Sequence, residues 1–445
     1  MIHARPFSRR AFLAGLGATV ALPSSALGAS TNPDVVVVGA GAAGLAAART
    51  LLDEGLSVVV LEAAGRTGGR AWTESDTFGV PFDHGCSWVM GPADLPYIAK
   101  AREWGFTLHN HNSAGESIFV GDRKATGQER GEYDSAWASI NSALNKAGRD
   151  GLDVAAATVV PSDMPFSGVS QTWMGPMDFA VDFDELSTLD NWMFGDTGAY
   201  YMIREGYGTL VARDGSGLPV MLETPVTAID WSGEGVAVET PSGTVRARAC
   251  IVTVSTGVLG SGDISFAPAL PLWKQEAIDR LPMGLLMKIA LEFDGERFGL
   301  GDNNWMTYHV ENLLPARACY FLTFPFSFDL MIGFTGGRFG RELAAEGSDA
   351  AIDFALGELA AIFGNDVHKH FVRGLATDWD SNPWTRGAYA AAIPGHHGAR
   401  AELARPVADR IFFAGEATAA PWYQLAGGAW LNGRSVAREV AATLS

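Results

Sequence analysis

Residues 34–62 of the chain read DVVVVGAGAAGLAAARTLLDEGLSVVVLE. The β-branched run at residues 35–38 favours a strand that is buried on both faces. A glycine-rich turn at residues 39–44 follows directly, and residues 45–52 are rich in alanine and leucine, which favours a helix. Residues 56–62 predict a second strand that ends on a glutamate. This order of strand, glycine turn, helix, strand and acid predicts a βαβ dinucleotide-binding unit.

Four residues of this unit have distinct expected roles. Gly39 permits the tight turn, Gly41 lets the backbone approach a pyrophosphate, and Gly44 lets the helix pack closely on the strand. Glu62 is expected to accept hydrogen bonds from ribose hydroxyls. The helix N-terminus supplies N–H groups and positive potential for the phosphates.

The fingerprint alone does not distinguish NAD from FAD. A second glycine- and arginine-rich loop, GRTGGR at residues 65–70, lies just past the acid. Residues 83–88, DHGCSW, add another glycine turn beside a tryptophan. These loops favour FAD, because its phosphates and isoalloxazine ring extend past the first glycine turn.

These motifs resemble those of the flavin-containing amine oxidase family, which includes monoamine oxidases, polyamine oxidases and lysine-specific histone demethylases. The resemblance covers nearly all of the chain after the first 31 residues. Two departures are Ala64, where the family usually has an arginine, and Glu205, where it usually has a glycine. Seven ordered blocks carry the resemblance, at residues 61–70, 85–88, 206–210, 224–229, 252–259, 268–288 and 412–433.

The resemblance implies an α/β plus α+β fold. A Rossmann-type FAD-binding domain would be interwoven with a mixed-sheet and helical substrate-binding domain. The FAD-binding domain is expected to take residues 32–90, 206–285 and 375–445, and the substrate-binding domain to take 91–205 and 286–374. Such a division would make each domain from segments that are far apart in the sequence.

Two local patterns predict further elements. Residues 236–254, with turn residues Ser242 and Gly243, predict a β-hairpin. Residues 342–363 are rich in alanine, leucine and glutamate and predict a helix of the substrate-binding domain.

The resemblance also implies a set of cofactor contacts. Val226 is expected beside the adenine, and Glu416 beside the ribityl chain, where it can also serve as a helix-capping acid. The expected cofactor-binding residues are Gly39, Gly41, Ala43, Gly44, Glu62, Ala63, Arg66, Gly69, Arg70, Gly85, Ser87, Trp88, Val226, Trp379, Gly415, Glu416, Gly428 and Ala429.

Lys288 is the most informative candidate for catalysis. It follows a glycine and an apolar stretch, where an unpaired ammonium group is costly. The family's matching lysine holds a water near flavin N5, and the resemblance implies that role here; the alternative is a surface lysine at a strand edge. The implied reaction is oxidation of an amine C–N bond by hydride transfer to flavin N5, followed by hydrolysis of the imine to a carbonyl compound. The protein would position and desolvate the amine.

Aromatic residues are expected to frame the substrate. The resemblance implies that Trp422 is one wall of an aromatic cage and that Trp384 is a second. The substrate pocket is further expected to include Met90, Tyr389, Tyr423 and Trp430. The alternative is that the rings belong to the core, as large rings usually do.

The flavin is expected to be non-covalent. Monoamine oxidases attach their flavin through a cysteine in the C-terminal region that carries these aromatic residues. The three cysteines here, Cys86, Cys250 and Cys319, lie elsewhere in the sequence, and three cysteines do not make a disulfide framework.

Met90 also bears on the substrate. Many polyamine oxidases place a glutamate or histidine at this position, so the apolar methionine argues against a strict polyamine specialist. An acidic group elsewhere would either line an entrance for a polycation or form a solvated face, and the second is commoner. The group consists of Asp178, Asp182, Asp184, Glu185 and Asp190.

Residues 1–31 predict a targeting segment. They contain Arg5, Arg9 and Arg10 but no acid, and an apolar run at residues 12–22 that is too short to span a bilayer. The paired arginines resemble a twin-arginine signal, which exports folded proteins; the alternative is an ordinary secretory signal. The protein is therefore expected in the periplasm, without stable insertion in the membrane.

The net charge and the spacing of the histidines argue against nucleic-acid binding, membrane binding and a metal site. The formal net charge of −18 argues against nucleic acid and anionic membranes as partners. Asp366, His368 and His370 alternate in the sequence, but no further ligand lies nearby, so we expect no metal site. The expected partners are a small amine and either O2 or a periplasmic electron carrier, and the protein is expected to be a monomer or homodimer.

Two other functions stay open. An L-amino-acid oxidase of the same superfamily would need an arginine to clamp the substrate carboxylate, and Arg204, Arg317 and Arg386 are available. The other alternative is a flavin-binding carrier that has lost catalysis. Retention of Lys288 and Trp422 argues against that carrier.

Overall fold

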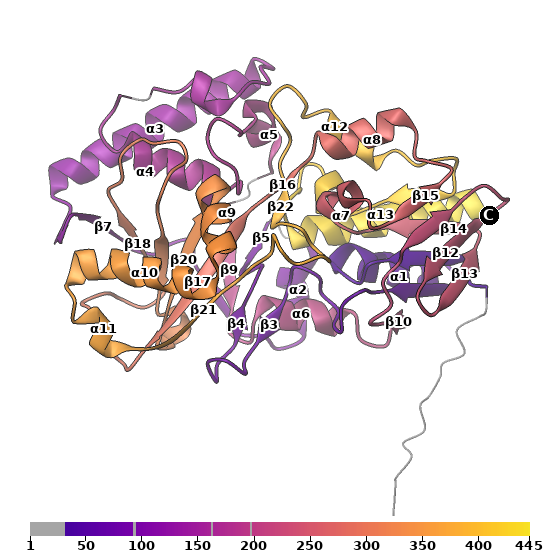
Figure 1. Ribbon diagram of the computed structural model, residues 1–445, viewed down its shortest axis with the longest axis horizontal. Helices are drawn as coiled ribbons and strands as arrows, with labels where there is room; N and C mark the ends of the chain where they lie inside the picture. Colours follow the sequence, from indigo (N-terminus) through magenta and orange to yellow (C-terminus); the bar gives the residue numbers. More distant parts are fainter. Residues whose placement is uncertain (1–31, 92–94, 162, 196–197) are drawn as a thin grey trace, which may run out of the picture.

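The computed structural model describes residues 32–91, 95–161, 163–195 and 198–445, so the predicted targeting segment lies outside the described residues. Two halves lie side by side, and each is assembled from segments that are far apart in the sequence (Figure 1). One half contains a parallel sheet, and the other contains a mixed sheet covered by helices. The predicted fold class is confirmed, whereas the residue boundaries of the two domains stay a prediction.

The first half is built on a five-stranded parallel sheet. Its central strand β1 is the predicted valine run, and all four valines are between 0 and 3% exposed. Its order is β10 (Val220–Met221), β2 (Val58–Leu61), β1 (Val35–Val38), β14 (Ala249–Val252) and β23 (Ile411–Phe413).

Two helices, α1 (Ala42–Asp53) and α13 (Ala426–Leu444), pack side by side on one face of this sheet. Their backbones approach closely at Gly433, because a Cβ atom there would lie 2.1 Å from the carbonyl oxygen of Ala43. This contact places the C-terminal helix next to the glycine turn at the start of the chain.

A four-stranded sheet and three helices cover the opposite face. The predicted hairpin at residues 236–254 is partly correct, because residues 249–252 leave it and join the parallel sheet as β14. The covering elements are β13 (Gly243–Ala247), β12 (Val236–Thr240), β11 (Ala228–Asp230), β15 (Ser265–Ala267), α7 (Thr256–Ser261), α8 (Leu272–Asp279) and α12 (Ala399–Ala404).

The second half contains a seven-stranded mixed sheet. Strands β18 and β7 pair in parallel, and the other neighbours pair antiparallel. Its order is β21 (Phe371–Ala376), β17 (Leu286–Phe293), β20 (Leu330–Gly336), β19 (Tyr320–Thr323), β18 (Asn304–Tyr308), β7 (Glu116–Val120) and β8 (Arg123–Lys124).

Helices pack around the mixed sheet (Figure 1). The predicted helix at residues 342–363 is divided into two, because Gly347 has a φ of +99° and interrupts the helical backbone. The helical elements are α3 (Gly127–Arg149), α4 (Ser167–Thr172), a π-helical turn η2 (Trp173–Met177), α5 (Thr188–Met193), α9 (Gly337–Glu346), α10 (Ser348–Phe363) and α11 (Val367–His370).

Short sheets lie where the chain passes between the halves. Among the described residues, no helix is both long and apolar enough to cross a membrane. The short elements are β3 (Thr73–Glu74), β4 (Phe82–Asp83), β5 (Trp88–Met90), β9 (Tyr200–Ile203), β6 (Leu108–Asn110), β16 (Met283–Gly284) and β22 (Tyr389–Ala390), with helices α2 (Pro96–Glu103) and α6 (Tyr207–Asp214).

Candidate active site

A single cavity of about 1070 Å³ extends from the parallel sheet to the mixed sheet. At one end it is lined by residues that follow the carboxyl ends of β1, β2, β14 and β23. Ligands of open parallel sheets bind at these ends, outside the strands. At the other end the lining comes from β17, β18 and β20 of the mixed sheet. The cavity therefore spans the two halves and is large enough for a dinucleotide together with a small substrate.

The glycine turn is shaped for a phosphate group. Gly39 has a φ of +99°, and a Cβ atom at Gly44 would lie 1.9 Å from the carbonyl oxygen of Gly39, so each position requires glycine. A Cβ atom at Gly41 would meet nothing within 4 Å, and Gly41 lines the cavity. The space beside Gly41, at the N-terminus of α1, is therefore left open on the protein side for a pyrophosphate.

Glu62 directly follows the last residue of β2. Its carboxylate accepts hydrogen bonds from the backbone N–H groups of Ala40, at 2.6 Å, and Ala64, at 2.8 Å. Burial raises the pKa of Glu62, and the two N–H groups partly oppose that rise. Glu62 also lines the cavity, and its contact with ribose hydroxyls stays a prediction.

Arg66 brings a cation to the same end of the cavity. Its guanidinium lies 4.5 Å from the centre of the Trp72 ring, and burial lowers its pKa to about 10. Within the described part of the chain, Arg66 forms no ion pair within 4 Å. The Arg66 guanidinium is half-buried, and the nearby Glu62 offsets only part of the effect of burial on its pKa. A cation in this setting fits a bound anion, and a pyrophosphate beside Gly41 would supply one. The residues present therefore fit FAD.

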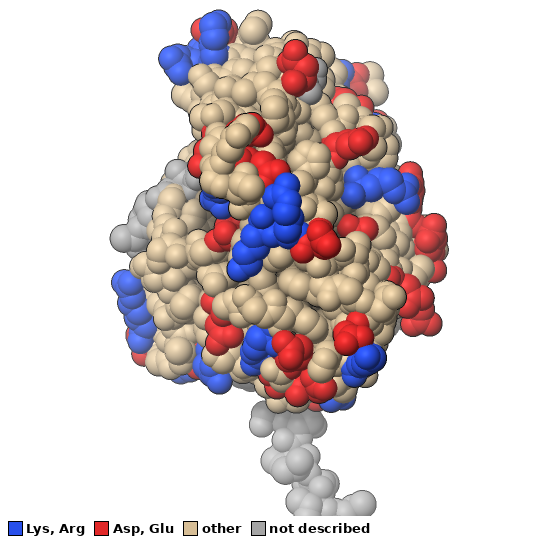
Figure 2. Space-filling model, turned by 90° about the vertical axis from the view of Figure 1, so that its left-hand side faces the viewer, with Lys and Arg blue, Asp and Glu red and all other residues tan. Residues whose placement is uncertain are grey.

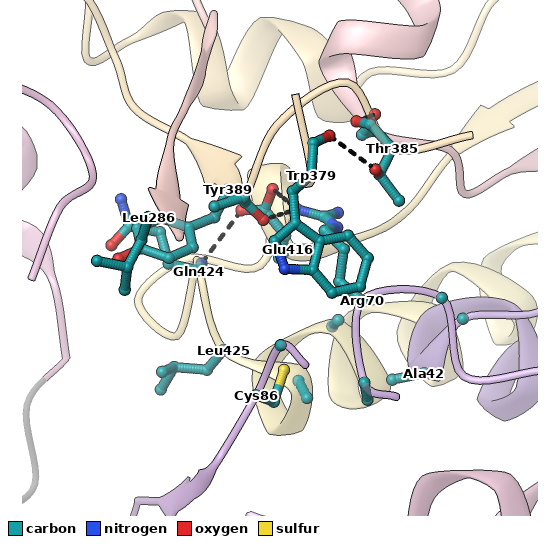
Figure 3. A pocket seen from close by; sticks show the side chains of 18 of the residues that line it. Ala42, Arg70, Cys86, Leu286, Trp379, Thr385, Tyr389, Glu416, Gln424 and Leu425 are labelled. Carbon is teal, nitrogen blue, oxygen red and sulfur yellow. Dashed lines mark hydrogen bonds and ion pairs between the residues drawn. The ribbon is translucent and has the colours of Figure 1, made fainter. Parts of the chain in front are cut away.

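Arg70 and Glu416 form an ion pair at the middle of the cavity. The Nη1 atom of Arg70 donates to Glu416 Oε1 at 2.9 Å and to the carbonyl oxygen of Ala388 at 2.8 Å. Glu416 also accepts from the backbone N–H groups of Ala390, at 3.0 Å, and Gln424, at 3.2 Å. The pair holds the segments that contain Ala390 and Gln424 against the glycine-rich loop (Figure 3).

Lys288 lies on β17 at the junction of the two halves. It is only 4% exposed, and its ammonium group donates to the carbonyl oxygens of Asp83, at 2.7 Å, and Gly85, and to Oγ of Ser87. Burial lowers the pKa of Lys288 to about 8, and the nearby Asp83 opposes part of that effect. Lys288 is therefore a buried cavity-lining lysine and not a residue of a surface strand edge.

An aromatic cluster adjoins Lys288, and we call it the tryptophan box. The rings of Trp88 and Trp305 stack with centroids 5.5 Å apart, and Trp173 meets Trp305 edge-on at 4.9 Å. Phe334 lies 5.7 Å from Trp88 and 5.6 Å from Trp305, and the Lys288 ammonium lies 5.7 Å from its ring. The members of the box, Trp88, Trp173, Trp305 and Phe334, all line the cavity.

His111 fixes one wall of this box. Its Nε2 lies 3.0 Å from the carbonyl oxygen of Asn303 and must donate to it, so Nδ1 accepts the indole N–H of Trp88 at 3.1 Å. Burial lowers the pKa of His111, which favours the neutral ring that this arrangement needs.

Tyr389 and Gln424 line the cavity beside the Arg70–Glu416 pair (Figure 3). The Tyr389 hydroxyl donates to the carbonyl oxygen of Asp178 at 3.0 Å, which fixes the ring. Gln424 has a left-handed backbone with a φ of +64°, and its Nε2 donates to the carbonyl oxygen of Ala390 at 3.1 Å.

The structure brings most of the predicted site residues to this cavity. Lys288, Trp384, Met90 and Tyr389 line it, although Trp384 is 45% exposed and lies toward the rim. The predicted cofactor-binding residues that line it are Gly39, Gly41, Ala43, Glu62, Ala63, Arg66, Gly69, Arg70, Gly85, Ser87, Trp88, Val226, Trp379, Gly415, Glu416 and Ala429.

Five predicted residues do not line the cavity: Gly44, Gly428, Trp422, Tyr423 and Trp430. Gly44 acts instead through helix packing. The ring of Trp422 lies against Gly195, and Tyr423 is buried with its hydroxyl donating to the carbonyl oxygen of Asp190.

The expected position of Trp422 as a cage wall is therefore corrected. The left-handed backbone of Gln424 turns the segment so that Gln424 and Leu425 face the cavity in place of Trp422 and Tyr423. Trp430 lies on α13, where its indole N–H donates to Asp214 at 2.8 Å.

Sequence reasoning missed Trp173, Trp305, Phe334, His111 and Gln424. These residues lie in separate parts of the chain and no motif connects them.

The acidic group of residues 178–190 is divided in the structure. Asp182, Asp184 and Glu185 lie within 4.0 Å of Arg338, and Asp190 pairs with Arg400. Asp178 alone among the five lines the cavity. On the face shown in Figure 2, acidic and basic side chains are interspersed. The alternative of an acidic entrance built from all five residues is therefore wrong.

The histidine pattern at residues 366–370 lies on the short helix α11. Asp366 pairs there with Lys369, and His370 pairs with Asp294. Over the described ranges of the chain, no group of three or more histidine, cysteine, aspartate or glutamate residues has a metal-binding arrangement.

Comparison with known proteins identifies the family. The profile of the flavin-containing amine oxidoreductase family matches residues 42–161 and 177–441. The chain belongs to this family, and the predicted class of enzyme is confirmed.

Curated relatives include polyamine oxidases and histone demethylases. Polyamine oxidase 2 of Arabidopsis thaliana is 29% identical over 92% of this chain and 88% of its own length. Polyamine oxidase 4 of Oryza sativa subsp. japonica is 28% identical over 94% of this chain and 90% of its own length. Lysine-specific histone demethylase 2 of Homo sapiens is also 28% identical, but the chain spans about half of that protein, 54%.

Solved structures share the fold. Wild-type putrescine oxidase bound to putrescine superposes with a TM-score of 0.76, at 23% identity, over 92% of this chain and 99% of that one. Cyclohexylamine oxidase from Brevibacterium oxydans IH-35A gives a TM-score of 0.75, at 22% identity, over 93% of this chain and 99% of that one.

Proposed function

We propose that the protein is an exported FAD-dependent oxidase of monoamines that carry an apolar, preferably cyclic, substituent. The observation that supports this most directly is the position of Lys288. It adjoins both the loop at residues 83–87, on the side of the glycine-rich cradle, and the tryptophan box. A substrate in the box would therefore meet Lys288 where the two halves join.

The cofactor would be held by the glycine turn, Glu62, Arg66 and the Arg70–Glu416 pair. When bound, FAD supplies a hydride acceptor for oxidation of the amine α-carbon. The protein would contribute the other steps. The tryptophan box would exclude water from the substrate, and Tyr389 and Gln424 would limit the orientation of the substrate. Lys288 would hold a water at the junction by exchanging one of its three hydrogen bonds, which it donates to Asp83, Gly85 and Ser87.

The charges of the cavity favour a substrate with one amino group. The positive charge that adjoins the tryptophan box is Lys288. Of the four lining carboxylates among the described residues, Glu62, Glu416 and Asp263 are engaged with backbone N–H groups or arginines, and Asp178 lies in the segment that contacts Tyr389. A second ammonium group placed in the box would lie near Lys288, and at 4 Å such a repulsion amounts to about 1 kcal/mol in water and more in a buried site. Met90 adds a further apolar contact.

The relatives include proteins named for monoamine substrates and proteins named for substrates with several amino groups. Polyamine oxidases and putrescine oxidase are named for substrates with two or more amino groups, whereas cyclohexylamine oxidase is named for a monoamine with an aliphatic ring. The tryptophan box and Met90 lead us to favour the second kind of substrate for this chain.

The deciding experiment is anaerobic reduction of the flavin by a panel of amines. Cyclohexylamine and benzylamine are expected to bleach the flavin absorbance at lower concentrations than putrescine or spermidine. Faster bleaching by putrescine or spermidine would contradict the proposed substrate class. A protein that contains flavin but is bleached by none of these amines would be a flavin carrier.

The positions of the three candidate arginines argue against an L-amino-acid oxidase, which would need one of them to bind the substrate carboxylate. Arg386 pairs with Asp263 and Arg317 with Glu342, while Arg204 donates to the carbonyl oxygen of Phe326. None of these three arginines is among the residues that line the cavity. Amino acids included in the panel are expected to leave the flavin oxidised.

We propose that the flavin is non-covalent. Cys250, in β14, and Cys319, just before β19, are buried and do not line the cavity, whereas Cys86 lines it. Burial raises the pKa of the Cys86 thiol, which keeps it protonated and weakly nucleophilic. Acid precipitation is expected to release all of the flavin into solution. Yellow colour that stays with the precipitate would contradict this, and a Cys86→Ala variant would then show whether Cys86 is the point of attachment.

Export by the twin-arginine route is part of the same proposal, and it rests on the arginine pair near the start of the chain. Fusion of residues 1–31 to a reporter that functions only in the periplasm would test it, with Arg9→Lys and Arg10→Lys together as the control. We propose O2 or a periplasmic carrier as the electron acceptor and a monomer or homodimer as the assembly. Peroxide formation by the reduced enzyme in air would identify O2.

A further inference from the structure

A buried ion pair joins the two halves close to the cavity. Asp190, in the first turn of α5, is 1% exposed, and its carboxylate accepts from Nε and Nη2 of Arg400, each at 2.7 Å. His397 Nδ1 lies 2.9 Å from the same carboxylate. Burial opposes ionisation of Asp190, but Arg400 and the hydrogen bonds outweigh it, so the pKa of Asp190 lies well below its ordinary value.

Arg400 connects this carboxylate to two further segments. Its Nη2 donates to the carbonyl oxygen of Ala390 at 3.0 Å, and its Nη1 donates to the carbonyl oxygen of Ala417 at 3.0 Å. The same Ala390 carbonyl accepts from Gln424 Nε2 at 3.1 Å. One guanidinium therefore ties α5 to β22 and to the loop that contains Glu416 and Gln424.

The residues next to these anchor points form the cavity wall. Asn191 and Trp192, which follow Asp190, line the cavity on one side. Tyr389, which precedes Ala390, and Gln424 line it on the other. The Arg400 fork contributes to the distance between the two sides, together with the Ala392 N–H, which donates to Asp190 Oδ2 at 3.0 Å, and the Tyr423 hydroxyl, which donates to the carbonyl oxygen of Asp190. The planar geometry of guanidinium fixes that distance in a way that an ammonium group does not.

We propose that Asp190 and Arg400 are positioning residues that set the spacing between the α5 wall and the Tyr389–Gln424 wall, and thereby determine which amines fit. A buried ion pair is a weak source of stability, because apolar residues of similar volume often stabilise a protein as well or better. A role in geometry accounts for the pair better than a role in stability. The inference rests on the proposed amine oxidation, since selectivity is its readout.

The test compares two conservative variants with a matched control. Arg400→Lys keeps the charge but loses the fork, and Asp190→Asn keeps the shape but loses the charge. The control is Lys274→Met, which removes another buried cation that binds the opposite end of α12, at the carbonyl oxygens of residues 402, 403 and 405. The measured quantity is the ratio of kcat/KM for cyclohexylamine to kcat/KM for n-butylamine, with the FAD content of each protein.

We expect this ratio to change about tenfold in Arg400→Lys and Asp190→Asn, mainly through KM, because small misplacements of substrate have large kinetic effects. The Lys274→Met control is expected to lower the Tm and leave the ratio unchanged. An unchanged ratio in FAD-loaded Arg400→Lys and Asp190→Asn would overturn the proposal. If neither variant folds, the apolar double variant Asp190→Leu with Arg400→Met decides by the same ratio.

A second readout separates this inference from the proposed function. If no amine reduces the wild-type flavin, the proposed function fails, and crystal structures of wild type and Arg400→Lys then test the positioning role alone. A shift of Asn191 relative to Tyr389 in the variant would support it. The same distance between Asn191 and Tyr389 in both structures would refute the positioning role.

Discussion

Lys288 shows how one side chain connects the sequence to the chemistry. Its place after a glycine and an apolar stretch predicted burial, and its ammonium group is buried among acceptors from residues 83–87. Those acceptors come from the other half of the molecule and are more than 200 positions away in the sequence. The position of Lys288 therefore depends on both halves being folded together.

Replacing Lys288 with methionine should separate binding from catalysis. Methionine has a similar length and is tolerated in apolar surroundings, so the Lys288→Met variant should retain FAD. Loss of the group that holds a water should slow flavin reduction or reoxidation about a hundredfold. Stopped-flow absorbance at the flavin bands measures both rates, and traces identical to wild type would refute the assignment.

The same residue predicts a pH dependence. Because burial lowers the pKa of Lys288 to about 8, its positive charge is lost as the pH rises through that value. The charge opposes the positive charge that develops on the substrate nitrogen, so kcat/KM should rise between about pH 7 and 9. The amine must also lose its proton, which gives a second ionisation at higher pH.

Lys288→Met is the control for that pH profile. The variant should keep the ionisation of the amine and lose the one near pH 8. A profile with the same two ionisations in both proteins would assign the lower one to another group.

At the scale of elements, the glycine turn and α1 show two different needs for glycine. A Cβ atom at Gly44 would collide with the carbonyl oxygen of Gly39, whereas a Cβ atom at Gly41 would meet only the space that we assign to pyrophosphate. Gly44 is therefore required for packing within the protein, whereas Gly41 leaves room for a ligand.

The two glycines can be distinguished by a matched pair of variants. Gly44→Ala should lower the free energy of unfolding of the apoprotein by about 1–3 kcal/mol, as overpacking does, and should weaken FAD binding as a consequence. Gly41→Ala should leave apoprotein stability nearly unchanged and still weaken FAD binding. Urea unfolding of apoprotein and titration with FAD measure the two effects. Equal destabilisation by both substitutions would contradict this division.

Two elements differ from what local patterns predicted; long-range pairing explains the first, and the backbone of one glycine explains the second. Residues 249–252 have the composition of a hairpin continuation but pair with β1 and β23, because both faces of the parallel sheet are buried and need apolar strands. The predicted helix at residues 342–363 is interrupted at Gly347, where α9 ends and α10 begins, because Gly347 has a φ of +99°.

At the scale of the whole molecule, the cavity belongs to neither half alone. The glycine turn and Glu62 come from the parallel-sheet half, whereas Trp305 and Phe334 come from the mixed sheet. FAD bound between Gly41 and Lys288 would contact residues from both halves. The cofactor is therefore expected to stabilise their association.

Removal of FAD should consequently lower the Tm of the protein. A ligand that binds only the folded state stabilises it by about 2.7 kcal/mol at a free concentration of 100 times its Kd, and the effect grows with the logarithm of concentration. Thermal unfolding of apoprotein with increasing FAD measures this dependence, and NAD serves as the control ligand. A Tm that is independent of added FAD, or that rises equally with NAD, would contradict an FAD site.

The candidate site was predictable where its residues lie in one motif. Gly39, Gly41 and Glu62 line the cavity, and the order of strand, turn, helix, strand and acid was sufficient to find them. Arg70 also lines it, and the resemblance of residues 61–70 to the family's motif led to that prediction. Trp422 was misplaced because the turn at Gln424 redirects the loop, and the handedness of a non-glycine residue is not visible in composition. Trp88 was predicted as a cofactor contact, whereas Trp173, Trp305 and Phe334 of the tryptophan box were missed because they come from three other segments of the chain.

The sequence by itself determined the class of fold, the family and the end of the parallel sheet at which a dinucleotide binds, because these depend on short-range patterns of apolar residues and glycines. Only the tertiary structure decided which aromatic rings face the substrate, that Lys288 is buried at the junction, and that Asp190 and Arg400 tie the walls together. These features depend on contacts between residues that are distant in the chain. Side-chain packing brings such residues together, and no local spacing encodes it.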